Sequence, residues 1–190
     1  LNRLWREVGA LDDQVEIYNR DPFLTCEYQG QTACFYRDVE KLRRHFLALS
    51  PEDAPEISRL CGDIKRFTKV SMPVVDIKGV KVKRKSSLSL TDALRMLPAV
   101  TRMPFYAKQT VAEYAGRFKS PLIRLVLESL IGCDYCATGM IFTAATLASG
   151  DGGYPAGGSL AMANRMAARL ERLGGSIHYG KLVRQVAVRD

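Results

Sequence analysis

A glycine-rich segment at residues 150–159, GDGGYPAGGS, constrains the fold of this chain more than any other feature. The fourteen residues that follow, LAMANRMAARLERL, carry apolar side chains at helical spacing and end at Gly174 and Gly175, a typical helix stop. The next residues predict a strand near Ile177 and a second strand through Val183, Val186 and Val188. Nucleotide-binding folds are assembled from turn, helix and strand units of this kind.

Gly157 and Gly158 have a defined conformational task in that segment. Without a Cβ atom they can adopt positive φ and let a ligand approach the backbone, and Ser159 can cap the helix that follows. A helix N-terminus favours an electron-rich group nearby. An ordinary tight turn is the alternative interpretation.

The remaining sequence predicts an α+β fold in which a short antiparallel sheet is covered by several helices. Short β-rich runs at about 15–36 are separated by Asp21-Pro22 and Gln29-Gly30-Gln31, which is typical of an antiparallel meander. Helices are expected between about 38 and 148, interrupted by a loop at 71–89. Their predicted ranges are 38–49, 50–70 (with Ser50 as N-cap), 91–101, 106–118, 120–131 and 135–148.

The bulk composition is that of an ordinary globular chain. Of 190 residues, 47% are hydrophobic and 25% are charged, which is enough apolar sequence for one core or for one domain plus part of another. No uncharged apolar run reaches the roughly 18 residues that a membrane span requires. Five cysteines, an odd number, do not suggest a secreted disulfide framework, so we expect a cytoplasmic location.

The net charge of +8 raises the question of an anionic partner. The main basic cluster, residues 78–85 (KGVKVKRK), contains no aromatic residue, which favours a solvated loop over a nucleic-acid site. We therefore expect no nucleic-acid partner. Attraction of this cluster to anionic lipid headgroups, with peripheral association with a membrane, stays open as an alternative.

Two further residue groups were weighed as metal or redox sites. Cys133 and Cys136 form a lone CxxC inside an apolar helical stretch, where small buried residues are the favoured interpretation over redox or metal chemistry. His45 and His178 match no ligand spacing. The sequence predicts no metal site.

The segment from Gly153 to Val186 resembles a known family. Its pattern YPxGG, helix, GG, strand and VxxV is similar to the YPxGG-to-VxxI segment of phytoene desaturase-like (carotenoid oxidoreductase) flavoenzymes, in the amine-oxidase-like superfamily. Residues 91–95 (TDALR) and the stretch from Leu130 to Thr143 resemble the helical substrate region of carotenoid desaturases. The N-terminal strands and the segments 38–42 and 50–54 also fit that family's order.

This resemblance implies a two-domain, FAD-dependent oxidoreductase with a split dinucleotide-binding fold. Residues 1–149 would be the substrate domain, and 150–190 would be the helix-strand piece of a partial FAD-binding domain. The chain contains no GxGxxG unit. We therefore expect it to be an interior piece of a longer flavoenzyme that is inactive alone and that self-associates through apolar surface left uncovered.

The resemblance also implies roles for individual residues. Gly157, Gly158 and Ser159 would form a turn beside the flavin, and the main chain of Val183 would bind the adenine. Tyr154 would border the substrate, or would pack under the turn. Asp92 and Arg95 would place an acid and a cation near the flavin; the alternative is an ordinary pair at a helix start.

The function implied is desaturation or isomerisation of a polyene or a related apolar small molecule, by hydride transfer to FAD. An amine- or protoporphyrinogen-oxidase-like flavoenzyme is the close alternative. A hypothesis of another class also stays open: a non-catalytic, basic module that binds a membrane or a protein.

Overall fold

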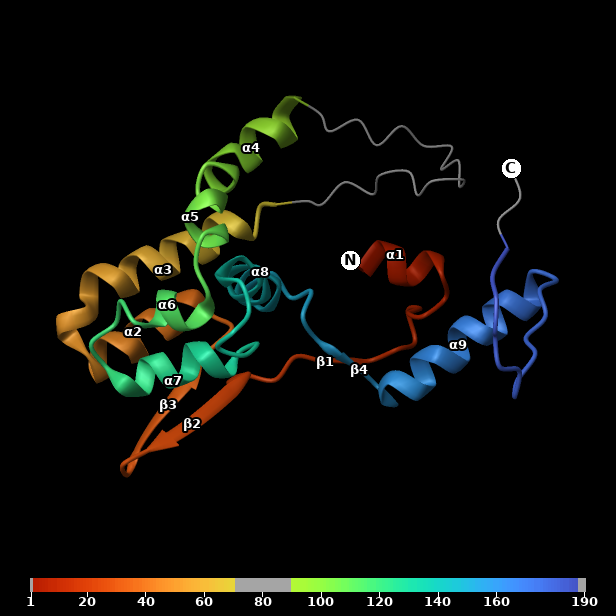
Figure 1. Ribbon diagram of the computed structural model, residues 1–190, viewed down its shortest axis with the longest axis horizontal. Coiled ribbons are helices and arrows are strands. Elements are labelled where there is room, and N and C mark those ends of the chain that lie inside the picture. Colours follow the sequence, from red (N-terminus) through yellow and green to blue (C-terminus); the bar gives the residue numbers. More distant parts are fainter. Residues whose placement is uncertain (1, 71–89, 188–190) are drawn as a thin grey trace. The chain divides into compact units, whose positions relative to one another are not determined.

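The computed structural model describes residues 2–70 and 90–187, which divide into two compact units. The central unit is Asn19–Gly153, and the terminal unit combines Leu1–Tyr18 with Tyr154–Asp190. The architecture is α+β, as predicted, with helices and two small two-stranded antiparallel sheets (Figure 1).

The sheet of the central unit is a hairpin of β2 (Leu24–Tyr28) and β3 (Gln31–Phe35). Gln29 and Gly30 make the two-residue turn with positive φ values of 50° and 75°, the conformation that a tight hairpin requires. Helix α7 (Pro121–Ser129) packs on both strands, and α2 (Val39–Leu49) packs on β3. The predicted meander was wrong, because the third β-rich run, β1 (Ile17–Tyr18), pairs with β4 (Tyr154–Pro155) instead.

Local capping signals explain where the first helices begin. The Asp38 carboxylate accepts a hydrogen bond from the Lys41 amide at 2.8 Å, which starts α2 at the predicted place. Ser50 is an N-cap, as predicted, but of a short 3-10 helix at Pro51–Asp53, and its side chain caps no amide there. The Ser50 hydroxyl donates to Asp53 at 2.8 Å, and the 3-10 helix leads into α3 (Ala54–Phe67).

The later helices follow the predicted order with one correction. Helix α4 spans Leu90–Val100, α8 spans Ala137–Ala148, and α7 lies between them. The single helix predicted at 106–118 is two helices, α5 (Met103–Ala107) and α6 (Val111–Ala115). A capping box between Thr110 and Glu113 starts a new helix there, because it satisfies amides that a continuous helix would bond internally.

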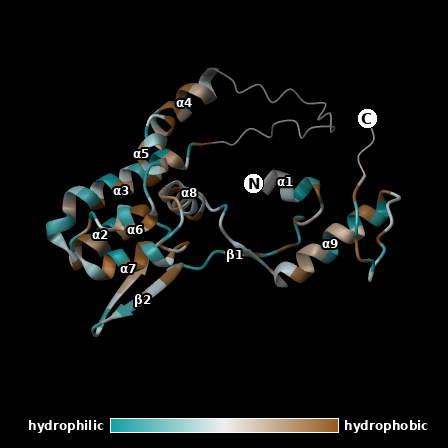
Figure 2. Ribbon diagram, in the orientation of Figure 1, coloured by the Kyte–Doolittle hydropathy of each residue, from teal (hydrophilic) through white to brown (hydrophobic). Residues whose placement is uncertain are grey.

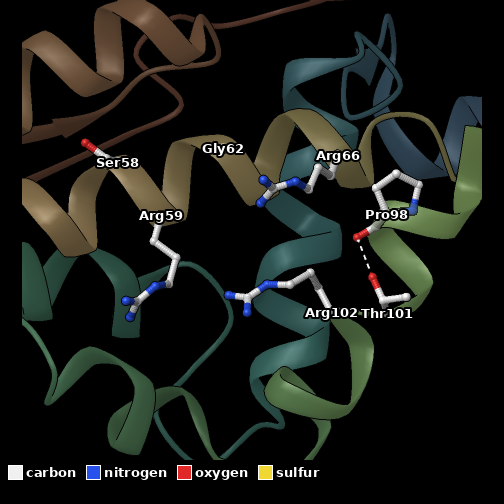
Figure 3. Close-up of a pocket in the computed structure, with 7 residues that line it drawn as sticks. All are labelled: Ser58, Arg59, Gly62, Arg66, Pro98, Thr101 and Arg102. Carbon is white, nitrogen blue, oxygen red and sulfur yellow. Dashed lines mark hydrogen bonds between the residues drawn. The ribbon is translucent and has the colours of Figure 1, made fainter.

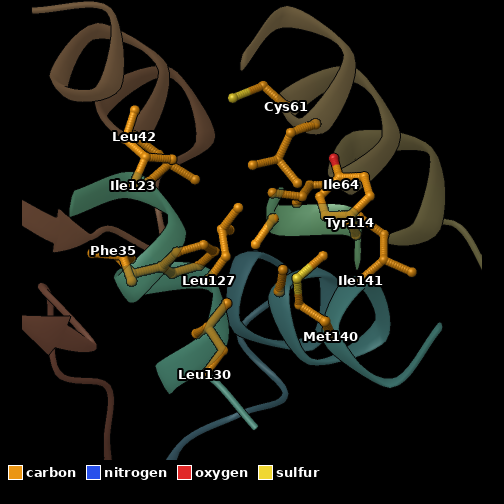
Figure 4. Packing of buried hydrophobic residues seen from close by; sticks show 14 of the residues in the cluster. Phe35, Leu42, Cys61, Ile64, Tyr114, Ile123, Leu127, Leu130, Met140 and Ile141 are labelled. Atoms are coloured by element: carbon orange, nitrogen blue, oxygen red, sulfur yellow. The ribbon is translucent and has the colours of Figure 1, made fainter. Parts of the chain in front are cut away.

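One hydrophobic core unites the helices of the central unit with the hairpin. Helix α8 contributes Met140 and Ile141 to it, packed against α3, while Phe35 enters from β3 (Figure 4). Tyr106 and Tyr114 are fully buried in the same core, with ring centroids 5.3 Å apart. This core fixes α3, and with it the site described below.

The terminal unit consists of α1 (Asn2–Glu7), β1, β4 and α9 (Gly158–Arg172). The Arg165 side chain of α9 donates to the Ala10 carbonyl at 2.8 Å, and Gly9 allows close approach, since a Cβ there would meet the Arg169 side chain at 2.7 Å. In Figure 2, hydrophobic residues occur along α9 and the segment after it, yet α9 buries none of its residues.

The unit boundaries differ from the predicted division at 149/150. The break falls at 153/154, and residues 1–18 belong with the C-terminal segment because β1 needs β4 to satisfy its backbone groups. The predicted strands near Ile177 and through Val183 are not found within the described residues up to 187, where no neighbouring strand pairs with them. Among the described residues, no helix combines the length and the apolar character needed to cross a bilayer.

Candidate functional site

The glycine turn of the terminal unit adopts the conformation that its sequence predicts. Gly157 has a φ of 79° and is the N-cap of α9, and Gly158 follows with a φ of 69°. A Cβ on Gly157 would lie 2.6 Å from the Ala161 Cβ, so a side chain there is excluded by both strain and contact. Gly158 and Ser159 are exposed.

Ser159 does not cap α9, contrary to the prediction. The N-cap is Gly157, and no side-chain hydrogen bond caps this helix end, because Ser159 is already the second residue of α9. The first amides of a helix have no intrahelical acceptor. Their donors are therefore available to an acceptor on a ligand.

Tyr154 and Val183, two other predicted site residues, lie in the same unit. Tyr154 pairs with Tyr18 across the β1–β4 ladder and is 55% exposed, so it does not pack under the turn. Val183 is 72% exposed in a segment without regular secondary structure. Tyr154 and the glycine turn lie close together through chain continuity.

Asp92 and Arg95 lie on α4 in the central unit. Arg95 is exposed, and the Asp92 side chain lies outside the described residues, so their predicted pairing is untested. The basic cluster 78–85 also lies outside the described residues.

A groove of about 590 Å³ between α3 and the α4–α5 connection is the second candidate site. Ser58, Arg59, Gly62 and Arg66 line it from α3, and Pro98, Thr101 and Arg102 line it from the other wall (Figure 3). Three guanidinium groups thus face one groove. This is not the apolar channel expected for a lipophilic substrate, which stays a prediction.

Asp63 anchors two of these arginines from below the groove. Its carboxylate is fully buried and accepts from Arg66 Nη1 at 2.6 Å and from Arg102 Nη2 at 2.8 Å. The buried hydroxyl of Tyr106 donates to the same carboxylate at 2.8 Å. Burial alone would raise the pKa of Asp63, but the hydrogen bonds from Arg102, Tyr106 and Arg66 lower it below its ordinary value.

Glu56 holds the third arginine of the groove. Arg59 Nη1 donates to both of its carboxylate oxygens, at 2.7 and 2.9 Å, and Arg117 donates to them at 3.1 and 3.2 Å. The Phe105 ring lies under two cations of this network, 4.7 Å from the Arg102 guanidinium and 5.2 Å from that of Arg117.

Sequence reasoning missed this groove, although part of its signal was visible. Glu56 precedes Arg59 by three residues and Asp63 precedes Arg66 by three, a spacing that pairs charges on a helix. Arg59 and Arg66 are seven residues apart, which places them on one helix face. Arg102 could not have been assigned, because its partner lies 39 residues earlier in the chain.

Cys133 and Cys136 differ from the prediction that they are buried. Both are free, and they are exposed because they lie in the connection between α7 and α8, where Cys136 is the N-cap of α8. A hydrogen bond to Asp134 raises the pKa of Cys133, which disfavours a reactive thiolate. Within the described part of the chain, His, Cys, Asp and Glu residues form no group of three or more that could hold a metal ion.

Comparison with known proteins adds no assignment. No protein-family model, no curated protein and no solved structure matches this chain.

Proposed function

We propose that this chain is part of an FAD-dependent oxidoreductase that desaturates or isomerises a polyene or a related apolar molecule. The observation that carries the proposal is the Gly157–Gly158 turn. Both glycines have positive φ values, and the turn joins the short strand that contains Tyr154 to the start of α9, which no side chain caps. The flavin, when bound, would accept hydride from the substrate. An amine or protoporphyrinogen substrate is the close alternative.

The residues present fit such a cofactor at the turn. Gly157 and Gly158 have no side chains, so a planar ring edge can approach their backbone. The amides at the start of α9 lack a side-chain acceptor and point along the positive end of the helix dipole, which suits an electron-rich edge. Tyr154 is exposed in the residues just before the turn, where it would contact the substrate.

The uncovered apolar residues of the terminal unit also support the proposal. Its exposed large hydrophobic residues, each at least 46% exposed, include Leu160, Leu170, Leu173, Leu182, Val183 and Val186. Surface of this kind normally lies against another part of a protein. This exposure fits a unit that forms one layer of a larger nucleotide-binding fold, and it leads us to expect self-association when that layer is uncovered.

The test is the visible absorption spectrum of the longest soluble form of this protein, measured after reconstitution with FAD and removal of unbound flavin. The variant Gly158→Val should lose the flavin band, because a β-branched residue is strained at a φ of 69° and its side chain would stand on the ring edge. Gly174→Val is the matched control. Gly174 also has a positive φ, 87°, and open space around it, but it lies beyond the opposite end of α9.

Two outcomes would contradict the proposal. One is the absence of a flavin band in the spectrum of the longest soluble form, which would favour the non-catalytic interaction module. The other is an equal loss of flavin in the Gly158 and Gly174 variants, which would show that strain in α9, not the turn, controls binding.

A further inference from the structure

The arginine groove and its ion-pair network carry a net positive charge. Among the described residues, the four guanidiniums of Arg59, Arg66, Arg102 and Arg117 pair with two carboxylates, those of Glu56 and Asp63. With four positive and two negative charges, this network carries a net charge of +2. Residues 71–89, which connect α3 to α4 in sequence, contain a single acid, Asp76, and so bring little negative charge of their own.

Each of the three groove arginines has guanidinium N–H donors that its ion pair does not use. Arg66 uses only Nη1, Arg59 uses only Nη1, and Arg102 uses Nε and Nη2. The other guanidinium nitrogens of these side chains have no acceptor among the described residues. Ser58 also lines the groove from α3.

These arginines are also held in place before any ligand arrives. Asp63 is fully buried and binds Arg66 and Arg102 at once, and the Phe105 ring supports Arg102 from its face. A side chain whose rotamer is already fixed loses little entropy on binding a ligand. Gly62, between the arginines on α3, leaves the groove floor open, since the nearest atom to a Cβ there would be Arg66 Nη1 at 3.8 Å.

We propose that this groove binds a phosphate monoester, with the phosphate group held by Arg59, Arg66 and Arg102. A phosphate monoester carries about two negative charges at neutral pH, which balances the net charge of +2 of this network, whereas a carboxylate carries one. Planar guanidinium forks fit phosphate oxygens in bidentate geometry. The groove volume of about 590 Å³ leaves room for the organic part of the ester. This site goes beyond the oxidoreductase function and lies in the other unit.

The phosphate group could come from a soluble ester or from a lipid headgroup, and two titrations distinguish these sources. Glycerol phosphate is titrated by calorimetry against the whole chain, and vesicles containing phosphatidic acid are tested by co-sedimentation. Saturable binding of glycerol phosphate assigns a soluble ester. Binding only to phosphatidic acid vesicles, lost in the variants below, assigns a headgroup.

The variant Arg66→Gln should weaken binding about tenfold, because it removes one charged donor. Ser58→Asp, which adds a negative charge at a residue that lines the groove, should also weaken binding, and it removes none of the charged groups of the network. Lys65→Gln is the matched control. It makes the same change in net charge on the same helix, but Lys65 pairs with Glu40 of α2 and does not line the groove. We expect it to change affinity less than about twofold.

Equal losses with Lys65→Gln and Arg66→Gln would overturn the site, since they would show attraction by net charge alone. Absence of saturable binding for both glycerol phosphate and phosphatidic acid would also overturn it. These titrations do not depend on flavin, so failure of either proposal leaves the other standing.

Discussion

Arg102 donates to Asp63 Oδ2 from two nitrogens, Nε at 3.1 Å and Nη2 at 2.8 Å, across 39 residues of sequence. The pair ties the start of α5 to the middle of α3. Asp63 is fully buried, whereas the Arg102 side chain is 31% exposed, so the cation reaches the groove while its carboxylate stays in the core.

Replacement of Asp63 by Asn should lower the free energy of unfolding by about 3 kcal/mol. This value is the lower end of the range for removing one partner of a buried ion pair, because both arginines left without Asp63 can reach solvent. Chemical denaturation with urea measures the change in free energy of unfolding. Glu40→Gln, which removes a carboxylate from a surface ion pair that is 54% exposed, should cost less than about 1 kcal/mol. Equal effects in the two variants would contradict the assigned role of Asp63.

Stability should fall in acid as Asp63 and Asp53 become protonated. Both carboxyl groups are buried, which alone would raise their pKa, but hydrogen bonds hold the pKa of each below its ordinary value. The unfolded chain therefore binds protons first, near pH 4, and the stabilisation is lost as pH falls through the lower pKa of the folded state. The urea concentration at the midpoint of unfolding should decrease as the pH is lowered from about 6 to about 3. The decrease should be smaller in Asp63→Asn; an unchanged pH profile in that variant would contradict the prediction.

His45 should give a second, separate pH dependence. Its Nε2 accepts a hydrogen bond from the Cys34 amide at 2.9 Å, so the ring is neutral, and burial lowers its pKa. Because the unfolded histidine titrates near pH 6.5, stability should decrease as pH falls below about 6.5 towards the lower folded pKa. In His45→Gln the slope of stability against pH in this range should flatten. A wild-type slope in His45→Gln would contradict this assignment.

The cysteines should react with an alkylating reagent in two classes. Burial raises the pKa of the Cys61 thiol to about 11, so this residue should stay unmodified until the protein unfolds. The exposed thiols of Cys133 and Cys136 should be modified in the folded protein. Peptide mass spectrometry after brief labelling, with and without urea, separates the two classes. Early modification of Cys61 would show that α3 opens locally.

The sequence was sufficient where short-range signals decide the structure. Asp38 and Ser120 both accept a hydrogen bond from an amide three residues later, and α2 and α7 begin where these signals predict. The glycine turn at Gly157 and Gly158 belongs to the same class, because its φ values follow from the residue type. The α+β class followed from the order of these local elements.

Long-range pairing is what the sequence could not supply. Tyr18 pairs with Tyr154, far away in the sequence. The residues near either one therefore could not predict that β1 leaves the expected meander or that the chain divides into these two units. The arginine groove depends in the same way on Arg102 reaching Asp63. Thr110 and Glu113 are a different case. Their spacing in the sequence matches a capping box, but the apolar pattern of 106–118 continues through it and favoured a single helix.

The bond from Cys34 to His45 also affects how the hairpin can associate with other chains. A strand at the edge of a sheet offers unpaired amides to any extended peptide, which is a common route to aggregation. On β3 the Cys34 amide is already taken by an imidazole from α2. A further strand could add at that point only by displacing His45, so this side chain helps protect a two-stranded sheet against edge-to-edge assembly.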